Sequence, residues 1–309
     1  MRVITVGLGI QGQKRSHVAG KDTVTTVDPV NPEADYRALK DIPLDTYDAA
    51  LVCVPDKDKN ELLTYLLSHG KHVLVEKPLV AEEDEEISRL ANLARSRNAV
   101  CYTAYNHRFE PHFVRMKQLI ESEKLGNLYL ARLFYGNGTA RDVRNSPWRD
   151  KDAGVLPDLG SHLLDTVLFW FGEPGVEFRV EAAHCFENQA FDHVSLSAQG
   201  KPVLELEATL VSWRNHFTAD VYAERGSAHI ESLCKWGPTT FTVRTRVLPS
   251  GRPPEEAVTL VEPDPTWRLE YEHFKQLCAA GGPSNTCNDI WLNQVLRRLS
   301  QEALAGASG

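Results

Sequence analysis

The stretch RVITVGLGIQG, residues 2–12, decides the fold of this chain. It begins with a short β-branched run at residues 2–6 and continues into a GxGxxG pattern at residues 7–12. After a strand and before a helix, such glycines permit a tight turn. They let the backbone approach a pyrophosphate, which the N–H groups of the helix N-terminus then bind. The dinucleotide-binding residues predicted from this turn are Gly7, Gly9, Ile10, Gln11 and Gly12.

An acidic residue follows at the position that this interpretation requires. A second β-branched run, residues 23–27, ends at Asp28, which lies 21 residues after Gly7. A carboxylate there accepts a hydrogen bond from the adenosine ribose and repels a 2′-phosphate, which favours NAD as the cofactor. Lys14 and Arg15 lie nearby in the sequence and leave NADP open. The alternative to dinucleotide binding is that residues 7–12 form an ordinary tight turn and that Asp28 belongs to a surface Asp-Pro turn.

Strands and helices alternate through the first hundred residues. Further strands are expected at residues 50–54, 72–76 and 100–104, and helices up to about residue 19 and at 60–68 and 82–97. Alternation at this spacing predicts a doubly wound parallel sheet with helices on both faces, an α/β Rossmann domain. We place this domain at residues 1–120.

The pattern changes in the remainder of the chain. After a helix at 113–120, β runs separated by turn residues predict a large, mostly antiparallel sheet, with a helix at 158–171 early in it and helices at 267–280 and 289–305 after it. The β runs are residues 127–135, 177–186, 192–198, 203–211, 216–223, 227–231, 239–247 and 257–261. We expect residues 121–309 to form an α+β domain that binds the substrate.

Composition excludes several classes of protein. The 309 residues carry 34 Lys and Arg against 42 Asp and Glu, a net charge of −8, so the chain lacks the basic surface that nucleic-acid binding needs. No run approaches the roughly 20 apolar residues of a membrane-spanning helix, and the N-terminus does not resemble a signal peptide. The six cysteines have no paired spacing, which favours buried, reduced thiols in a cytoplasmic protein.

One candidate for the chemistry follows the fourth strand. Glu76, Lys77 and Pro78 stand at its carboxyl end, where doubly wound sheets bind their ligands. Pro78 cannot continue the ladder, and a cis bond before it would fix the direction of Lys77. The alternative is an ordinary surface lysine at a strand exit.

A second candidate is the pair Asp158 and His162 in the segment GVLPDLGSHLLD, residues 154–165. In a helix these positions, four apart, share one face, so that Asp158 would orient the imidazole and His162 would carry a proton near neutral pH. A metal site is one alternative, although no convincing third ligand follows, and we expect none. A helix cap beside a partly buried histidine is the other.

With these motifs the chain resembles the Gfo/Idh/MocA oxidoreductase family over nearly its whole length. The matching blocks are the GxGxxG at 7–12, ALVCVP at 50–55, GKHVLVEKP at 70–78, NHRF at 106–109, PWR at 147–149, and Asp158, His162 and Asp165. Two sheet segments, FDH at 191–193 and GS at 226–227, also fit. The resemblance implies a Rossmann domain followed by a domain with an open-faced sheet, through which two or four copies associate.

The resemblance also implies roles for individual residues. The catalytic group would be Lys77, Asp158 and His162. Residues expected to lie against the cofactor, beyond the glycine turn and Asp28, are Pro55, Glu76, Lys77, Trp148 and Arg149. Residues expected to contact the substrate are Lys77, Asn106, Arg108, Arg149, Asp158 and His162.

These expectations combine into hydride transfer between NAD, or NADP, and a secondary alcohol or ketone of a sugar, cyclitol or sugar derivative. We expect Lys77 and His162 to face the same nicotinamide ring. His162 is the preferred proton carrier, because a histidine titrates near 6.5 and a lysine only near 10.4; Lys77 would polarise and orient the substrate. Two alternatives stay open: a non-catalytic dinucleotide-binding sensor, and an NAD-dependent glycosidase of the same fold.

Overall fold

The computed structural model describes residues 1–146 and 149–307, and its contacts divide the chain into two compact units. The first comprises Met1–Asn106 and Thr266–Gln294, and the second His107–Pro265 and Val295–Gly309. The chain therefore returns to the first unit after forming the second. This differs from the division predicted at residue 120, because residues 107–120 belong to the second unit and residues 266–294 to the first. Helix patterns along the chain do not reveal against which sheet a late helix packs.

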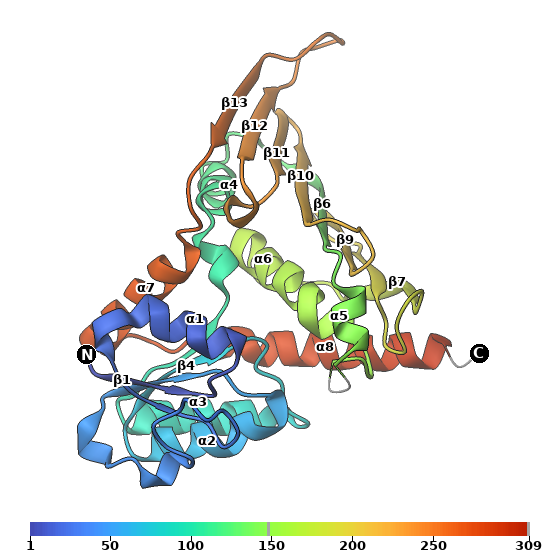
Figure 1. Ribbon diagram of the computed structural model, residues 1–309. Coiled ribbons are helices and arrows are strands. Elements are labelled where there is room, and N and C mark those ends of the chain that lie inside the picture. Colours follow the sequence, from blue (N-terminus) through green and yellow to red (C-terminus); the bar gives the residue numbers. More distant parts are fainter. Residues whose placement is uncertain (147–148, 308–309) are drawn as a thin grey trace. The chain divides into compact units, whose positions relative to one another are not determined.

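The first unit contains a five-stranded parallel sheet in the order β2-β1-β3-β4-β5. Figure 1 labels two of its strands, β1 and β4. Its strands are β1 Val3–Val6, β2 Thr23–Val27, β3 Ala49–Val52, β4 His72–Glu76 and β5 Cys101–Ala104. Every residue of β1, β3 and β5 is buried, as expected for short apolar strands that are covered on both faces. The predicted doubly wound parallel sheet is thus confirmed.

Helices cover both faces of this sheet. On one face α2 (Asp56–Ser68) and α3 (Asp84–Ser96) pack Leu63, Leu66 and Ile87 into one apolar cluster. On the other face lie α1 (Ile10–Ala19) and α7 (Thr266–Ala280), whose Phe274 is fully buried in a second cluster. The first half of α8 (Thr286–Ala307) also belongs to this unit. Short 3-10 helices are Gly20–Asp22, Leu39–Asp41, Leu44–Thr46 and Asn106–Phe109.

The second unit is built on an eight-stranded sheet in the order β13-β12-β11-β10-β6-β9-β8-β7. All neighbouring strands are antiparallel except β6 and β9, which run parallel. This confirms the mostly antiparallel sheet. The strands are β6 Leu128–Gly136, β7 Arg179–His184, β8 His193–Ala198, β9 Val203–Thr209, β10 His216–Ala223, β11 Gly226–Glu231, β12 Thr239–Thr245 and β13 Glu255–Leu260.

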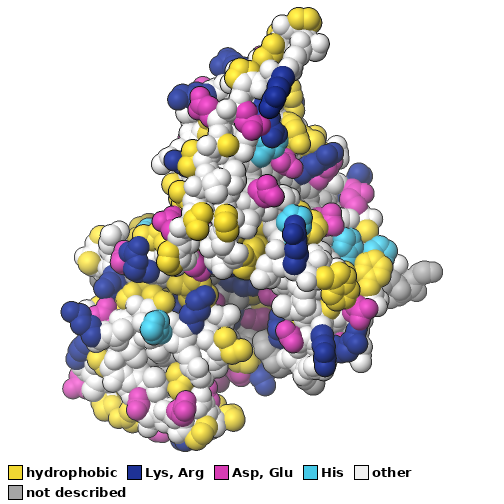
Figure 2. All heavy atoms as spheres, turned by 45° about the horizontal axis from the view of Figure 1, so that its top comes forward, with side chains coloured by type: hydrophobic (Ala, Val, Ile, Leu, Met, Phe, Trp, Pro, Cys, Tyr) yellow, Lys and Arg dark blue, Asp and Glu magenta, His cyan; other side chains and the backbone are white. Residues whose placement is uncertain are grey.

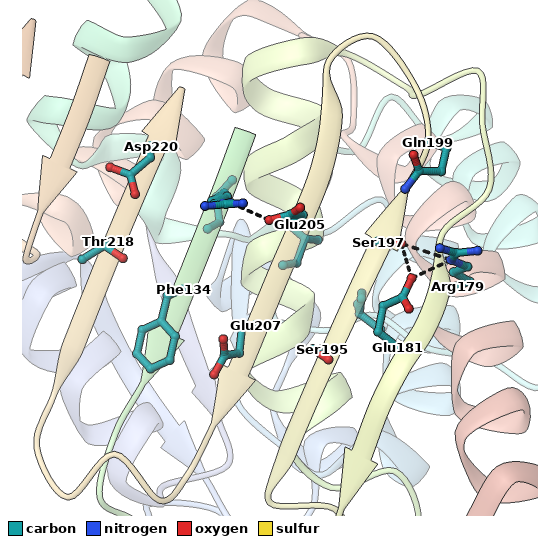
Figure 3. Close-up of a pocket in the computed structure, with 14 residues that line it drawn as sticks. Phe134, Arg179, Glu181, Ser195, Ser197, Gln199, Glu205, Glu207, Thr218 and Asp220 are labelled. Atoms are coloured by element: carbon teal, nitrogen blue, oxygen red, sulfur yellow. Dashed lines mark hydrogen bonds and ion pairs between the residues drawn. The ribbon is translucent and has the colours of Figure 1, made fainter. Parts of the chain in front are cut away.

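The two faces of this sheet differ in chemistry. Alternate residues of β6 and β10 (Leu133 and Phe217 among them) are buried on the inner face, where α4 (Pro111–Glu121) and α6 (Ser161–Phe171) pack. The outer face carries polar side chains around a shallow hollow, including the ion pair of Arg132 with Glu205 (Figure 3). The unit also contains the helix α5 (Ala140–Arg144) and the 3-10 helix Cys234–Trp236.

The helix predicted at 158–171 differs at its start. Residues Leu156–Gly160 form a π-helical turn, and regular α-helix begins only at Ser161. Pro157 lies in the first turn of this segment, where a helix leaves its N–H groups without an intrahelical acceptor, so the missing N–H of proline is tolerated there.

The cysteines, the helices and the surface charges bear on the expectations drawn from composition. All six cysteines are unpaired thiols, but Cys185 and Cys287 are exposed, contrary to the expectation that all six are buried. Within the described ranges, no helix is both long enough and apolar enough to cross a bilayer. Basic and acidic side chains are interspersed over the visible face in Figure 2.

Candidate active site

The glycine turn of the first unit has the shape that a dinucleotide requires. Gly7 has φ +87°, and a Cβ there would lie 2.5 Å from the carbonyl oxygen of Cys53; a Cβ on Gly12 would lie 1.8 Å from that of Gly7. A Cβ on Gly9, in contrast, would meet no described atom within 4 Å. Gly7 and Gly12 therefore hold the turn against β3 and α1, whereas Gly9 leaves open the backbone at the start of α1, which fits an approaching pyrophosphate.

The first turn of α1 is exposed toward solvent. Ile10 is 85% exposed and Gln11 is also exposed, and among the described side chains none caps the helix at Gly9. The N–H groups of this turn are thus accessible to phosphate oxygens. Pro55, another predicted cofactor residue, is exposed at the N-cap of α2, just beyond β3. These residues lie at the carboxyl edge of the sheet, as predicted.

Asp28 follows β2 directly and is held by the backbone. One carboxylate oxygen accepts from the N–H of Leu8 at 2.7 Å, and the other accepts from the N–H groups of Val30 and Asn31, each at 2.8 Å. Burial by itself raises the pKa of Asp28, but these three donors outweigh it and lower the pKa. Asp28 is therefore an anion at neutral pH, with its carboxylate oriented beside the glycine turn.

The two cations that left NADP open are engaged elsewhere in the first unit. Lys14 Nζ lies 3.7 Å from the centre of the Trp267 ring. Arg15 is 2% exposed and donates to Glu76 and Glu270, each at 2.6 Å. Burial opposes the charge of Arg15, but the two carboxylates outweigh that effect and raise its pKa. Neither cation is oriented as a ligand for a 2′-phosphate.

Lys77 is partly buried immediately after β4, and the Lys77–Pro78 peptide bond is cis, as predicted. Residue Lys59 of α2, which the sequence analysis did not select, brackets this turn. Its ammonium donates to the carbonyl oxygen of Glu76 at 2.6 Å and to that of Pro78 at 2.7 Å, and it pairs with Asp56 at 2.7 Å. Because these carbonyls flank Lys77 on both sides, Lys59 fixes the backbone that carries it.

A sequence signal for Lys59 existed. With Leu63 and Leu66 it occupies positions i, i+4 and i+7 of α2, the face that packs on the sheet. A lysine in an apolar stripe is buried only if it has partners.

In the second unit, Asp158 lies in the π-helical turn and accepts from Arg149 Nη2 at 3.0 Å, with about one third of each side chain exposed. The structure thus brings together two predicted residues, Asp158 and Arg149, in one ion pair. Trp148, predicted to contact the cofactor, lies outside the described residues.

His162, the predicted proton carrier, is 7% exposed in the first turn of α6. Its ring stacks on that of His107 with 4.1 Å between centroids and 21° between planes. Tyr135 of β6 contacts both rings, and its hydroxyl accepts from Lys235 Nζ at 3.0 Å. The sequence analysis did not select His107, Tyr135 or Lys235 as site residues, since they lie on elements far apart in the chain.

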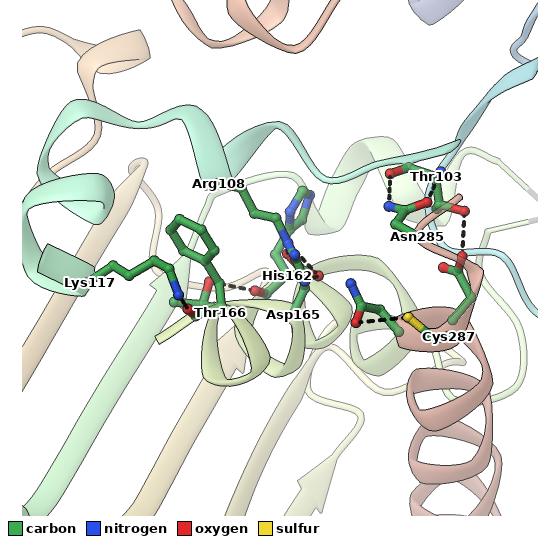
Figure 4. A network of polar contacts seen from close by, with 11 residues as sticks. Thr103, Arg108, Lys117, His162, Asp165, Thr166, Asn285 and Cys287 are labelled. Atoms are coloured by element: carbon green, nitrogen blue, oxygen red, sulfur yellow. Dashed lines mark hydrogen bonds and ion pairs between the residues drawn. The ribbon is translucent and has the colours of Figure 1, made fainter. Parts of the chain in front are cut away.

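Arg108 and Asn106, predicted to contact the substrate, make protein contacts. Arg108 forms a bidentate pair with Asp165 of α6, with its Nη2 2.6 Å from Oδ1 (Figure 4). Burial raises the pKa of Asp165, and the guanidinium opposes that shift. Asn106, in the first unit, donates to Thr266 Oγ1 at 2.8 Å. A direct role in substrate binding stays a prediction for both.

Among the described residues, no cluster of three or more His, Cys, Asp or Glu side chains has the arrangement of a metal site.

Comparisons with known proteins agree with this geometry. Residues 2–105 match the family model described as oxidoreductase family, NAD-binding Rossmann fold, and residues 113–229 match the GFO/IDH/MocA C-terminal domain. The chain belongs to the Gfo/Idh/MocA oxidoreductase family. Its first unit is accordingly an NAD-binding Rossmann domain, which confirms the predicted cofactor class.

Individual members of the Gfo/Idh/MocA family are distant. An uncharacterized oxidoreductase of Schizosaccharomyces pombe is 31% identical over 146 residues, 45% of this chain. Inositol 2-dehydrogenase of Rhizobium meliloti is 22% identical over 219 residues, 68% of this chain. The chain spans 38% and 61%, respectively, of the length of these two curated relatives. A levoglucosan dehydrogenase in complex with NADH has the same fold, with a TM-score of 0.82 at 19% identity, over 99% of this chain and 97% of that one.

Proposed function

We propose that the protein is an NAD-dependent dehydrogenase that oxidises a secondary hydroxyl, or reduces the ketone, of a sugar, cyclitol or sugar derivative. The observation that carries the proposal is the turn at Lys77, an amine held directly after β4 at the carboxyl edge of an NAD-binding Rossmann sheet. A cation there is suited to polarise an alcohol or carbonyl oxygen beside the cofactor.

In the proposed mechanism, the bound dinucleotide supplies the hydride acceptor or donor. During oxidation the substrate hydroxyl loses its proton to the His162 imidazole, while the ammonium of Lys77 donates a hydrogen bond to the substrate oxygen. In reduction the imidazolium returns the proton to that oxygen. Asp158, paired with Arg149, would contribute the negative charge near the imidazolium. Lys77 belongs to the first unit and His162 to the second, and we propose that both act on one substrate.

NAD is the proposed physiological cofactor. The ionised Asp28 beside the glycine turn disfavours a 2′-phosphate, and both Lys14 and Arg15 are committed to protein partners. Arg37 is the other nearby cation, and it donates to the backbone oxygens of Asp28, Asn31 and Pro32.

The substrate class rests on the names of relatives, an inositol 2-dehydrogenase and a levoglucosan dehydrogenase, both of which are named for cyclic polyhydroxy compounds. We further propose that copies of the chain associate through the outer face of the eight-stranded sheet, where acidic and basic side chains both line the hollow and Tyr222 is 38% exposed. Light scattering on the wild type and on Arg132→Glu would test this association, and a wild-type monomer would contradict it.

The experiment for the proposed activity is a cofactor-reduction screen over cyclitols, aldoses, sugar acids and nucleotide sugars, with NAD and NADP in parallel. We expect turnover with NAD, a higher kcat/KM for NAD than for NADP, and loss of single-turnover hydride transfer in His162→Ala and Lys77→Met. Wild-type rates in both variants would end the residue assignment. Cofactor binding without turnover would favour the sensor, and aglycone release without net NADH would favour the glycosidase.

A further inference from the structure

A cationic side chain lies beside the stacked histidines of the second unit. Lys235 is in the 3-10 helix Cys234–Trp236, and its Nζ reaches Tyr135 Oη at 3.0 Å and His107 Nε2 at 3.5 Å. It also lies over the rings of Tyr135 and Trp236. Four elements, β6, α6 and two 3-10 helices, therefore converge on one cluster, which we call the Lys235 cluster: His107, Tyr135, His162 and Lys235.

The direction of the hydrogen bonds constrains the protons in this cluster. An ammonium has only donors, so Tyr135 Oη and His107 Nε2 must both accept from Lys235. A ring nitrogen that accepts carries no proton. His107 is therefore a neutral imidazole whenever this contact holds.

The stacked geometry extends that constraint to His162. Its ring lies 4.1 Å from the ring of His107, and Tyr135 contacts both rings. His107 is 2% exposed and His162 is 7% exposed, so water would stabilise a positive charge on either ring only weakly. A positive charge on His107 would face the ammonium directly, and one on His162 would be stacked on the ring that accepts from this ammonium.

Other charged groups lie around the cluster, and one of them is Asp264, whose Oδ1 is 3.9 Å from the Sγ of Cys234. Arg108, next to His107, pairs with Asp165. Arg149 pairs with Asp158 on the helical turn before His162. Glu110 accepts from the N–H of Cys234, beside Lys235, and burial raises the pKa of this carboxyl. Lys235 is thus the cation whose hydrogen-bond partners in the cluster are both neutral groups.

We propose that Lys235 is a positioning residue that keeps the stacked pair His107 and His162 unprotonated and so holds His162 ready to accept a proton. This inference rests on the proposed dehydrogenase function, in which the imidazole of His162 receives the hydroxyl proton. The consequence is an enzyme whose oxidising direction stays active at a lower pH than an isolated histidine would allow.

Histidine NMR titration of the full chain tests, without any turnover, whether Lys235 keeps the two histidines unprotonated. With ring-labelled histidine, the signals of His162 and His107 are assigned from His162→Gln and His107→Gln. In Lys235→Met we expect the midpoint of His162 to move upward by on the order of one pH unit. Lys235→Arg keeps the cation and should match the wild type. Lys124→Met removes an exposed lysine of the same unit and should leave His162 unchanged.

An unchanged His162 midpoint in Lys235→Met overturns the inference, as does an equal shift in Lys124→Met. Should Lys235→Met fail to fold, Lys235→Gln provides the same loss of charge with a polar side chain.

The acidic limb of the pH profile of kcat/KM tests whether His162 is the group that accepts the substrate proton. We expect it to move upward in Lys235→Met by the same amount as the NMR midpoint. An NMR shift with an unmoved limb would support the control of the ring by Lys235 and contradict His162 as the proton acceptor. The two measurements therefore distinguish a failure of the Lys235 inference from a failure of the proposed role of His162.

Discussion

Arg15 offers the sharpest test of how the first unit is held together. Its guanidinium is buried between Glu76, at the end of β4, and Glu270 of α7, at 2.6 Å from each. Arg15→Met would keep much of the side-chain volume and remove the cation that both carboxylates share. The side chain of Glu270 is 0% exposed and that of Glu76 is 15% exposed, so water can hydrate only one of them.

Breaking a buried ion pair by removing one partner costs about 3–5 kcal/mol. Because a domain is stable by only about 5–15 kcal/mol, this variant should lose a large part of its free energy of unfolding. Urea denaturation followed by circular dichroism measures that loss. The matched control is Arg2→Met, since Arg2 pairs with Asp48 on the same unit with about half of its side chain exposed. That variant should be nearly as stable as the wild type.

The pH dependence adds a second check. At low pH both glutamates are protonated, so the wild type no longer gains from the two ion pairs and the variant no longer buries an anion that has lost the Arg15 guanidinium. The deficit should therefore shrink as pH falls. Adding Glu270→Met should recover part of the loss. A deficit for Arg15→Met no larger than that of Arg2→Met would refute this reasoning.

Three further predictions concern the cofactor edge of the sheet. Lys59→Met should displace Lys77 and so lower kcat/KM by up to about 100-fold. Replacing the exposed Lys57 of the same helix by Met should leave kcat/KM unchanged, and equal steady-state rates for the two variants would contradict the role of Lys59. Gly12→Ala should lower both the melting temperature and NAD affinity, whereas Gly9→Ala should lower affinity alone, as measured by thermal melts and calorimetric titration. Backbone N–H donors lower the pKa of Asp28 in the folded state, so its carboxylate stabilises the fold above the unfolded-state pKa of about 3.9 and loses that contribution as pH falls below this value. In acid denaturation curves, the stability advantage of the wild type over Asp28→Asn should therefore vanish.

Local sequence patterns were sufficient to predict the strands of both sheets and the residues at the carboxyl edge of the first sheet. All five parallel strands and all eight strands of the second sheet appear within a few residues of their predicted positions. Strand and helix periodicity involve neighbours two to four residues apart, which a single sequence displays directly. The glycine turn and Asp28 could be found for the same reason, because the first strand, the turn and the second strand form one continuous βαβ unit.

The partners of the candidate site residues came only from the tertiary structure. Arg15 meets Glu270 across 255 residues, and Lys235 meets Tyr135 across 100. Which distant residues meet depends on the order of strands in each sheet and on the helices that return to it. The parallel pairing of β9 with β6, and the return of α7 to the first unit, follow from no local pattern. Buried charges such as Arg15 and Lys59 are stable only with such partners, so the sequence alone established their identity, and the packing of the whole chain decided what they do.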